Sequence, residues 1–233
     1  MSEPREEILG AIRRAFKRGA LAAEAAGELS RRLAAHPRNP VPQRAAALEE
    51  EDRLRLFVAM AEEADARVSQ LDSLDAVPAA VAEYLARENL PAEIVMAPDP
   101  MLEALPWKRE PLLAIRRGRA EAGDAVSLTP AFAAIAETGT LMLISGAETP
   151  TSLNFLPDTH IVVVAARQVV ASYEEGFDLL RAAAAEKGWP RTVNFVTGPS
   201  RTADIEQTIE LGAHGPRRLH IILVGEREPA GKK

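Results

Sequence analysis

The chain has 233 residues, of which 47% are hydrophobic and only 4% aromatic, and its formal charge at pH 7 is −6. A chain of this length can build one substantial core and a smaller appendage, and its acidic balance disfavours a general nucleic-acid-binding protein. The absence of cysteine excludes disulfides, thiolate zinc sites, a cysteine nucleophile and iron–sulfur clusters ligated in the usual way.

The first third is predicted to be helical. Ile8, Ile12 and Phe16 recur every four residues, and an alanine-rich second segment follows. Three prolines within residues 36–43 end this pattern, and a third helix is expected over about residues 48–68. The acidic N-terminus lacks the apolar core of a signal peptide, and no apolar run approaches the roughly 20 residues that span a bilayer. We therefore expect a cytoplasmic protein without a membrane span.

From about residue 73 the pattern changes to short apolar runs separated by helical segments. Continuous apolar runs are typical of strands that are covered on both faces, and strands separated by helices favour a mostly parallel α/β sheet with flanking helices. The expected division is an N-terminal helical arm, residues 1–72, and an α/β domain, residues 73–228. The expected strands cover residues 93–97, 112–115, 125–128, 132–136, 140–145, 161–165, 193–196 and 219–224, with a helix over 173–184.

The first candidate site is the turn Glu137-Thr138-Gly139-Thr140 between two apolar runs, which are too close in sequence for a helical crossover and should form an antiparallel hairpin. Gly139 permits positive φ at the turn. Glu137 could then act as a general base, nucleophile or substrate acceptor, with Thr138 beside it in the catalytic group and Thr140 in a binding role. The alternative is a hairpin turn whose glutamate faces solvent.

The second candidate segment is Leu156-Pro157-Asp158-Thr159-His160, directly before an apolar strand. Asp158 can bond downstream amides as an Asx turn or contact a ligand. His160 could be an acid, a base or a ligand, because its ordinary pKa is near neutrality. A structural role at the start of the strand is the alternative.

The third candidate follows the strand at 193–196 and contains Gly198, Ser200, Arg201 and Thr202. A strand, a glycine turn and a helix would point free N–H groups at an anion, and the three side chains would add donors. Equally, Ser200 or Thr202 could simply cap a helix whose first turn carries Asp204 and Glu206. Residues 211–218 resemble the exit of that helix.

A metal cluster of Asp158, His160 and His214 lacks any familiar ligand spacing, so no metal site is predicted. Glycine-rich dinucleotide, Walker and nucleophile-elbow motifs are also missing, and we expect no nicotinamide, flavin or P-loop nucleotide cofactor bound by this chain.

Taken together, the three segments resemble the LutC-like lactate-utilization family, whose shared module is often called the LUD domain. The resemblance covers roughly residues 75–225. It implies a sheet related to the NagB/RpiA/CoA-transferase-like fold and a role, with partner proteins, in oxidizing L-lactate to pyruvate. Iron–sulfur clusters are then expected only in partner subunits, because this chain has no cysteine.

Two functions remain open. In the first, the chain is a non-redox subunit of a lactate-oxidizing assembly, in which the Arg201 loop holds a carboxylate and Glu137 or His160 accepts a proton. In the second, it is a free-standing enzyme acting on a phosphorylated or thioester small molecule, as an isomerase, CoA-transferase or cyclo-ligase-like fold would suggest. Either site hypothesis requires the three segments to meet in one pocket at one end of the sheet.

Overall fold

The computed structural model describes residues 3–17, 19, 21–202 and 210–225, which divide between Pro40 and Val41 into two compact units. The first unit contains the helices α1 (Glu3–Ala15) and α2 (Ala23–Ala35). Their apolar side chains stay largely exposed, Ile8 at 61% and Leu33 at 74%, and α2 buries no residue. The predicted helices of the N-terminal arm are present, and little of their described apolar surface is buried.

The second unit contains the α/β fold. Its α-helices are α3 (Glu50–Glu63), α4 (Val77–Arg87), α5 (Pro100–Glu103), α6 (Ser152–Phe155) and α7 (Tyr173–Lys187). Single 3-10 turns occur at η1 (Gln43–Ala45), η2 (Leu74–Ala76), η3 (Trp107–Arg109) and η4 (Ala166–Gln168). The strands are β1 (Arg67–Leu71), β2 (Glu93–Met96), β3 (Ala114–Arg117), β4 (Val126–Pro130), β5 (Ala133–Ile135), β6 (Thr140–Ile144), β7 (Thr159–Ala165), β8 (Val169–Val170), β9 (Val193–Val196), β10 (Arg201–Thr202), β11 (Glu210–Leu211) and β12 (Arg218–Val224).

The main sheet has six strands in the order β1-β12-β7-β4-β2-β3, and every neighbouring pair is parallel. All seven residues of the central strand β7 are buried, as expected for a parallel strand covered on both faces. The predicted α/β class, with a mostly parallel sheet and flanking helices, is therefore confirmed.

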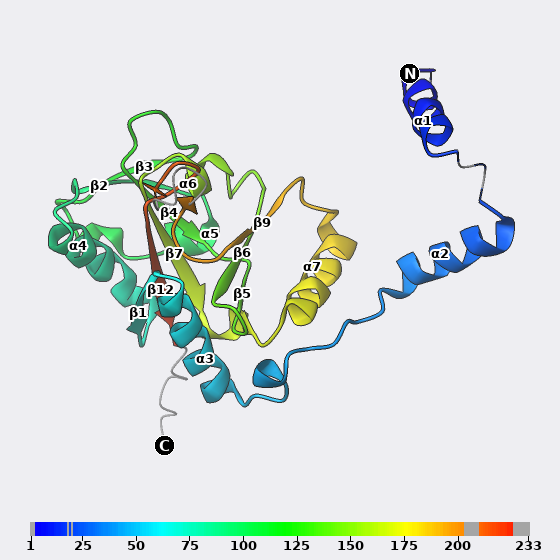
Figure 1. Cartoon of the computed structure of the whole chain (residues 1–233). Coiled ribbons are helices and arrows are strands. Elements are labelled where there is room, and N and C mark those ends of the chain that lie inside the picture. Colours follow the sequence, from blue (N-terminus) through cyan, green and yellow to red (C-terminus); the bar gives the residue numbers. More distant parts are fainter. Residues whose placement is uncertain (1–2, 18, 20, 203–209, 226–233) are drawn as a thin grey trace. The chain divides into compact units, whose positions relative to one another are not determined.

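A second sheet has the order β8-β5-β6-β9. Strands β5 and β6 pair antiparallel, with Ile135 opposite Thr140, so the predicted hairpin at Glu137–Thr140 is present. Helix α7 packs on this sheet, where Leu180 meets Ala133 and Met142. Figure 1 shows the second sheet and α7 on one side of the main sheet and α4 on the other.

Two apolar layers hold the unit together. On one face of the main sheet, α4 contributes Val81 and Leu85 to a core with the odd-numbered β7 residues Ile161 and Val163. On the other face, α3 and the second sheet pack against β7 and β12, with Phe57 fully buried. The alternating faces of β7 thus supply two different cores, which places the second sheet directly against the first.

The region around residue 65 differs from the expectation. Helix α3 ends at Glu63, Asp65 has a positive φ of 65°, and β1 follows, so Val68 belongs to a strand rather than to a helix. Because α3 lies in the core and β1 pairs with β12, both belong to the α/β unit. The structural division at residue 40 therefore falls earlier than the expected one at residue 72.

A second difference concerns the segment after Ser200. Arg201 and Thr202 pair antiparallel with Leu211 and Glu210, so these positions are strand rather than a helix start or a helix exit. Asp204 and Glu206 lie outside the described residues. Among the described helices, none is long and apolar enough to cross a membrane.

Candidate functional site

The Glu137 carboxylate is buried, with 5% of the residue exposed. Oε1 accepts a hydrogen bond of 3.1 Å from the Tyr173 amide, at the first residue of α7. The partial positive charge of this helix terminus favours a carboxylate there. Oε2 is also buried and has no hydrogen-bond partner among the described residues. The glutamate does not face solvent, so the solvent-facing alternative for this turn is wrong.

Threonine hydroxyls form a connected network beside Glu137. Thr140 Oγ1 lies 2.7 Å from Thr138 Oγ1, 3.1 Å from the Tyr173 hydroxyl and 2.6 Å from Thr197 Oγ1. Thr140 is fully buried, and unpaired hydroxyls there would carry a desolvation penalty. The network therefore joins the hairpin to the loop after β9.

Two glycines bring both of these segments against the C-terminal end of α3. Gly139 has φ of 64°, and a Cβ there would overlap the Ala61 amide nitrogen. Gly198 has φ of 71°, and a Cβ there would overlap the Ala64 carbonyl oxygen. Only glycine satisfies both the left-handed backbone and the close approach. Tight packing thus accounts for both glycines without a ligand.

His160 is fully buried in β7, where its Nε2 lies 2.7 Å from Thr129 Oγ1. Burial lowers the pKa of His160 to about 3. The imidazole is therefore neutral near pH 7, and its Nδ1 has no partner among the described residues. A histidine with this pKa is a weak proton acceptor, which disfavours the role of general base.

The loop after β9 is held mainly by its own backbone. Ser200 donates its amide to the Pro216 carbonyl at 2.8 Å, and its Oγ accepts from the His214 amide at 3.3 Å. Arg201 forms an exposed ion pair with Asp65, and Thr202 lies opposite Glu210 in β10–β11. The Arg201 guanidinium is therefore directed to a protein carboxylate.

Asp158 is exposed, and its backbone carbonyl accepts hydrogen bonds from the amides of Arg217 (2.8 Å) and Arg218 (3.1 Å). These bonds tie the start of β7 to the start of β12. The observed contacts of Asp158 are therefore backbone contacts.

A small pocket of about 210 Å³ lies where these segments meet, and we call it the motif pocket. It is lined by Asn154, Phe155, His160, residues 195–200, residues 214–216 and Leu219. Of the predicted site residues, His160, Gly198 and Ser200 line the pocket. Thr140 does not line it but is hydrogen-bonded to Thr197, which does. Glu137, Thr138, Gly139, Asp158, Arg201 and Thr202 do not line it. Two of the three predicted segments therefore share a pocket, and the hairpin touches it only through the hydroxyl network.

The motif pocket lies at the amino end of the main sheet, because His160 is the second residue of β7. No Arg, Lys, Asp or Glu side chain lines it in the described part of the chain. Burying a carboxylate without a paired cation is costly. Among the described residues, the pocket therefore offers no lysine or arginine to pair with the anion that the sequence predicted for this region.

A larger cavity of about 570 Å³ lies at the opposite end of the main sheet, where the strands have their carboxyl ends, and we call it the carboxyl-end cavity. Pro130 ends β4, Ala165 ends β7, and Asp99 lies three residues beyond the end of β2; all three line the cavity. Open α/β sheets bind their ligands beyond the carboxyl ends of the strands. Volume and position both make this cavity the stronger ligand site.

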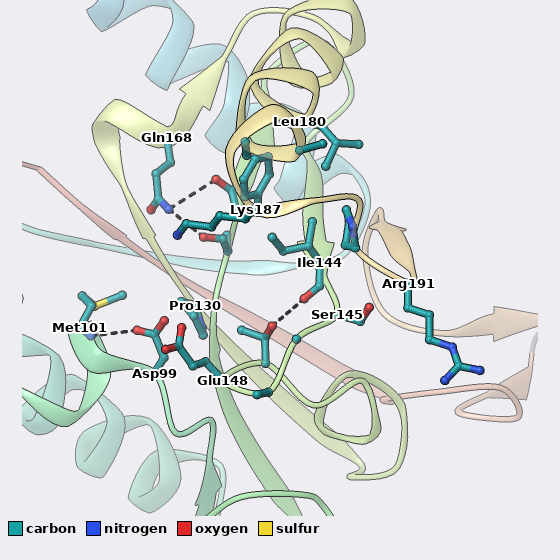
Figure 2. A pocket seen from close by; sticks show the side chains of 18 of the residues that line it. Asp99, Met101, Pro130, Ile144, Ser145, Glu148, Gln168, Leu180, Lys187 and Arg191 are labelled. Atoms are coloured by element: carbon teal, nitrogen blue, oxygen red, sulfur yellow. Dashed lines mark hydrogen bonds between the residues drawn. The ribbon is translucent and has the colours of Figure 1, made fainter.

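Charged groups of both signs line the carboxyl-end cavity. Asp99 and Glu148 contribute carboxylates, and Arg167, Lys187 and Arg191 contribute cations. Figure 2 shows the carboxylates of Asp99 and Glu148 on one wall, Lys187 with Gln168 on another, and Arg191 pointing away from them. Such an arrangement can pair a cation with the carboxylate of a ligand and accept a hydrogen bond from a hydroxyl of the same ligand.

Gln168 fixes part of this cavity wall. Its Oε1 accepts from the Ala165 amide and its Nε2 donates to the Ala131 carbonyl, each at 2.7 Å. The side chain thereby locks the ends of β4 and β7 together. These cavity residues were not among the predicted site residues, although Asp99 and Gln168 each follow a strand closely, which is the signal that could have indicated them.

Comparison with known proteins places these observations in a family. The sequence pattern of the LUD domain matches residues 54–224. The chain belongs to the LUD domain family. This LUD-domain chain is also similar to a crystal structure of a DUF162 family protein from Deinococcus radiodurans, with a TM-score of 0.58 and 28% identity. That similarity covers 76% of this chain and 99% of the other.

Curated relatives of the LUD-domain chain include proteins named "Lactate utilization protein C". Identity is 44% over 103 residues with the one from Deinococcus radiodurans and 35% over 103 residues with the one from Bacillus subtilis. Each match covers 44% of this chain, and 47% and 43% of the respective relatives. The chain thus spans about half the length of the curated relatives it matches.

Proposed function

We propose that this LUD-domain chain works in lactate utilization, as a component without a redox centre of its own. The observation that carries the proposal is its similarity to several proteins named "Lactate utilization protein C". Oxidation of L-lactate to pyruvate releases two electrons. Because the chain has no cysteine, we propose that iron–sulfur-containing partner subunits receive them.

The carboxyl-end cavity supports a role in holding the 2-hydroxy acid. Its cations can bind a carboxylate, and the carboxylates of Asp99 and Glu148 can accept a hydrogen bond from the neighbouring hydroxyl. In this proposal the hydroxy acid lies at the carboxyl ends of β4 and β7. The buried Glu137 then has a positioning role at the start of α7, and the Arg201 loop has a structural one.

Deleting the gene and testing growth on L-lactate as the sole carbon source tests the proposal. Growth should be lost on L-lactate, retained on pyruvate, and restored by the intact gene. Unimpaired growth on L-lactate would contradict the proposal.

Affinity purification of the tagged chain from its native cells tests the partner part. Iron–sulfur proteins should copurify with it. Recovery of the chain alone, together with a bound phosphorylated or thioester metabolite, would instead favour the free-standing enzyme.

A further inference from the structure

The carboxyl-end cavity is larger than lactate requires. Its volume is about 570 Å³, whereas a water molecule takes roughly 30 Å³ of liquid volume, and lactate has only six non-hydrogen atoms. Cavities of roughly 300–1,000 Å³ usually hold ligands of drug-like size. Much of the cavity would therefore remain outside the reach of a three-carbon acid.

Helix α7 presents a continuous stripe to this space. Leu180, Ala183, Ala184 and Lys187 all line the cavity, and their spacing of i, i+3, i+4 and i+7 places them on one helix face. The stripe is apolar for its first three members and ends in a cation. Lys187 is the last residue of α7, where the helix dipole favours a positive charge. The stripe therefore suits a ligand with an apolar body and an anionic end.

The carboxylates of Asp99 and Glu148, which form the acidic wall of the cavity, restrict which polar groups the ligand can carry. Asp99 Oδ1 accepts hydrogen bonds from the amides of Met101 (2.9 Å) and Leu102 (3.3 Å), which fixes its carboxylate at the start of α5. Glu148 approaches from the loop after β6 and lies on the same wall in Figure 2. Ionised carboxylates only accept hydrogen bonds, so the ligand should present a donor such as a hydroxyl to this wall.

We propose that the carboxyl-end cavity binds a 2-hydroxy acid whose apolar side chain is larger than the methyl group of lactate. Its carboxylate pairs with Lys187, its hydroxyl donates to Asp99 or Glu148, and its side chain lies against Ala184 and Leu180. The hydroxy-acid class rests on the proposed function, whereas the size of the side chain rests on the cavity and the α7 stripe.

Calorimetric titration of the full chain with L-lactate and L-3-phenyllactate tests this proposal. Phenyllactate should bind at least about tenfold more tightly, because its ring buries additional apolar surface in the cavity. Ala184→Leu fills the apolar end of the cavity with a good helix former, so it should weaken phenyllactate binding about tenfold and weaken lactate binding less. Lys187→Met should weaken both ligands.

Glu186→Gln serves as the matched control for Lys187→Met, since Glu186 is the exposed neighbour on α7 and does not line the cavity. It should bind both ligands like the natural chain. Binding of neither hydroxy acid, equal affinity for the two, or full binding by Lys187→Met would overturn the proposal. Inorganic phosphate is the third titrant, and tighter binding of phosphate than of phenyllactate would overturn the hydroxy-acid assignment.

The binding result and the growth result are independent. Phenyllactate binding by a chain whose deletion leaves growth on L-lactate intact would sustain the cavity assignment and contradict the proposed function. Loss of growth on L-lactate, with no binding of either hydroxy acid to the purified chain, would support the proposed function and contradict the cavity assignment.

Discussion

Gly139 packs directly against the backbone of Ala61, so that the turn of the β5–β6 hairpin contacts the last turns of α3. The residue that a motif search would read as part of a reactive loop is therefore required for packing. Gly198 makes the same kind of approach to Ala64 from the loop after β9. The two segments are held at one helix end, which explains how the hydroxyls of Thr140 and Thr197 come within 2.6 Å.

Gly139→Ala should destabilise the chain strongly. The added Cβ meets Ala61 backbone, and the left-handed φ adds strain of about 1–3 kcal/mol. Urea unfolding followed by circular dichroism measures the loss. Gly123→Ala is the matched control, because Gly123 also has positive φ, of 100°, but a Cβ there has nothing within 4 Å. Equal losses in the two variants would show that the contact with Ala61 is unimportant.

Thr140→Val tests the hydroxyl network. The substitution keeps the shape of the buried side chain but leaves Thr138, Tyr173 and Thr197 without their shared partner. The free energy of unfolding should fall by about 1–3 kcal/mol. Thr192→Val, at an exposed position before β9, should change it by less than about 0.5 kcal/mol. A Thr140→Val variant as stable as the natural chain would contradict the network's structural role.

His220 should make the fold sensitive to acid. Its ring stacks on Tyr84 with centroids 4.0 Å apart, and burial, with Arg87 and Arg67 nearby, lowers its pKa to about 4. The unfolded chain binds a proton near pH 6.5 and the folded chain does not, so stability falls as pH drops from about 6.5 towards 4. A shift of this size corresponds to on the order of 3 kcal/mol.

His220→Phe should lessen that pH dependence, because phenylalanine can keep the stack on Tyr84 and has no proton to bind. The contribution of His160, whose pKa is also lowered by burial, should remain. The measurement is the urea midpoint at several pH values between 7 and 4. An unchanged slope in the variant would mean that other groups, such as His160, dominate the acid response.

Arg201→Ala should have only a small effect. The ion pair with Asp65 is exposed, with 40% and 64% of the two side chains accessible, and such pairs contribute about 0–1 kcal/mol. Thermal unfolding should show little change, and calorimetry should show unchanged hydroxy-acid binding. Loss of ligand binding in this variant would restore the anion-binding role that the sequence suggested.

Much of the fold could be predicted from the sequence because its signals are local. The apolar run at residues 161–165 and the pattern through Tyr173 and Leu180 correctly indicated β7 and α7. Strand β1 was missed because Val68 also continued the helical spacing of α3, and the break depends on the positive φ of Asp65. The strand pair β10–β11 was missed because its pairing joins residues on either side of an intervening segment.

The candidate site was harder to predict because it depends on the direction of strands. His160 was expected at the start of a strand and does lie at the amino end of β7, whereas Asp99, Gln168 and Lys187 gather at the carboxyl end of the sheet. Sequence spacing shows that polar groups adjoin strands. It does not show which of these groups lie together at one end of the sheet, because that depends on the order and parallel direction of β7, β4 and β2.

The most direct test of the account is the location of a bound hydroxy acid. Backbone amide chemical shifts of the isotope-labelled chain can be followed during titration with L-3-phenyllactate. Shifts concentrated at Glu148, residues 165–168 and residues 184–191 would place the ligand at the carboxyl ends of β4 and β7, as predicted. Shifts concentrated instead at residues 154–160, 197–200 and 214–216 would place it in the motif pocket and contradict the account.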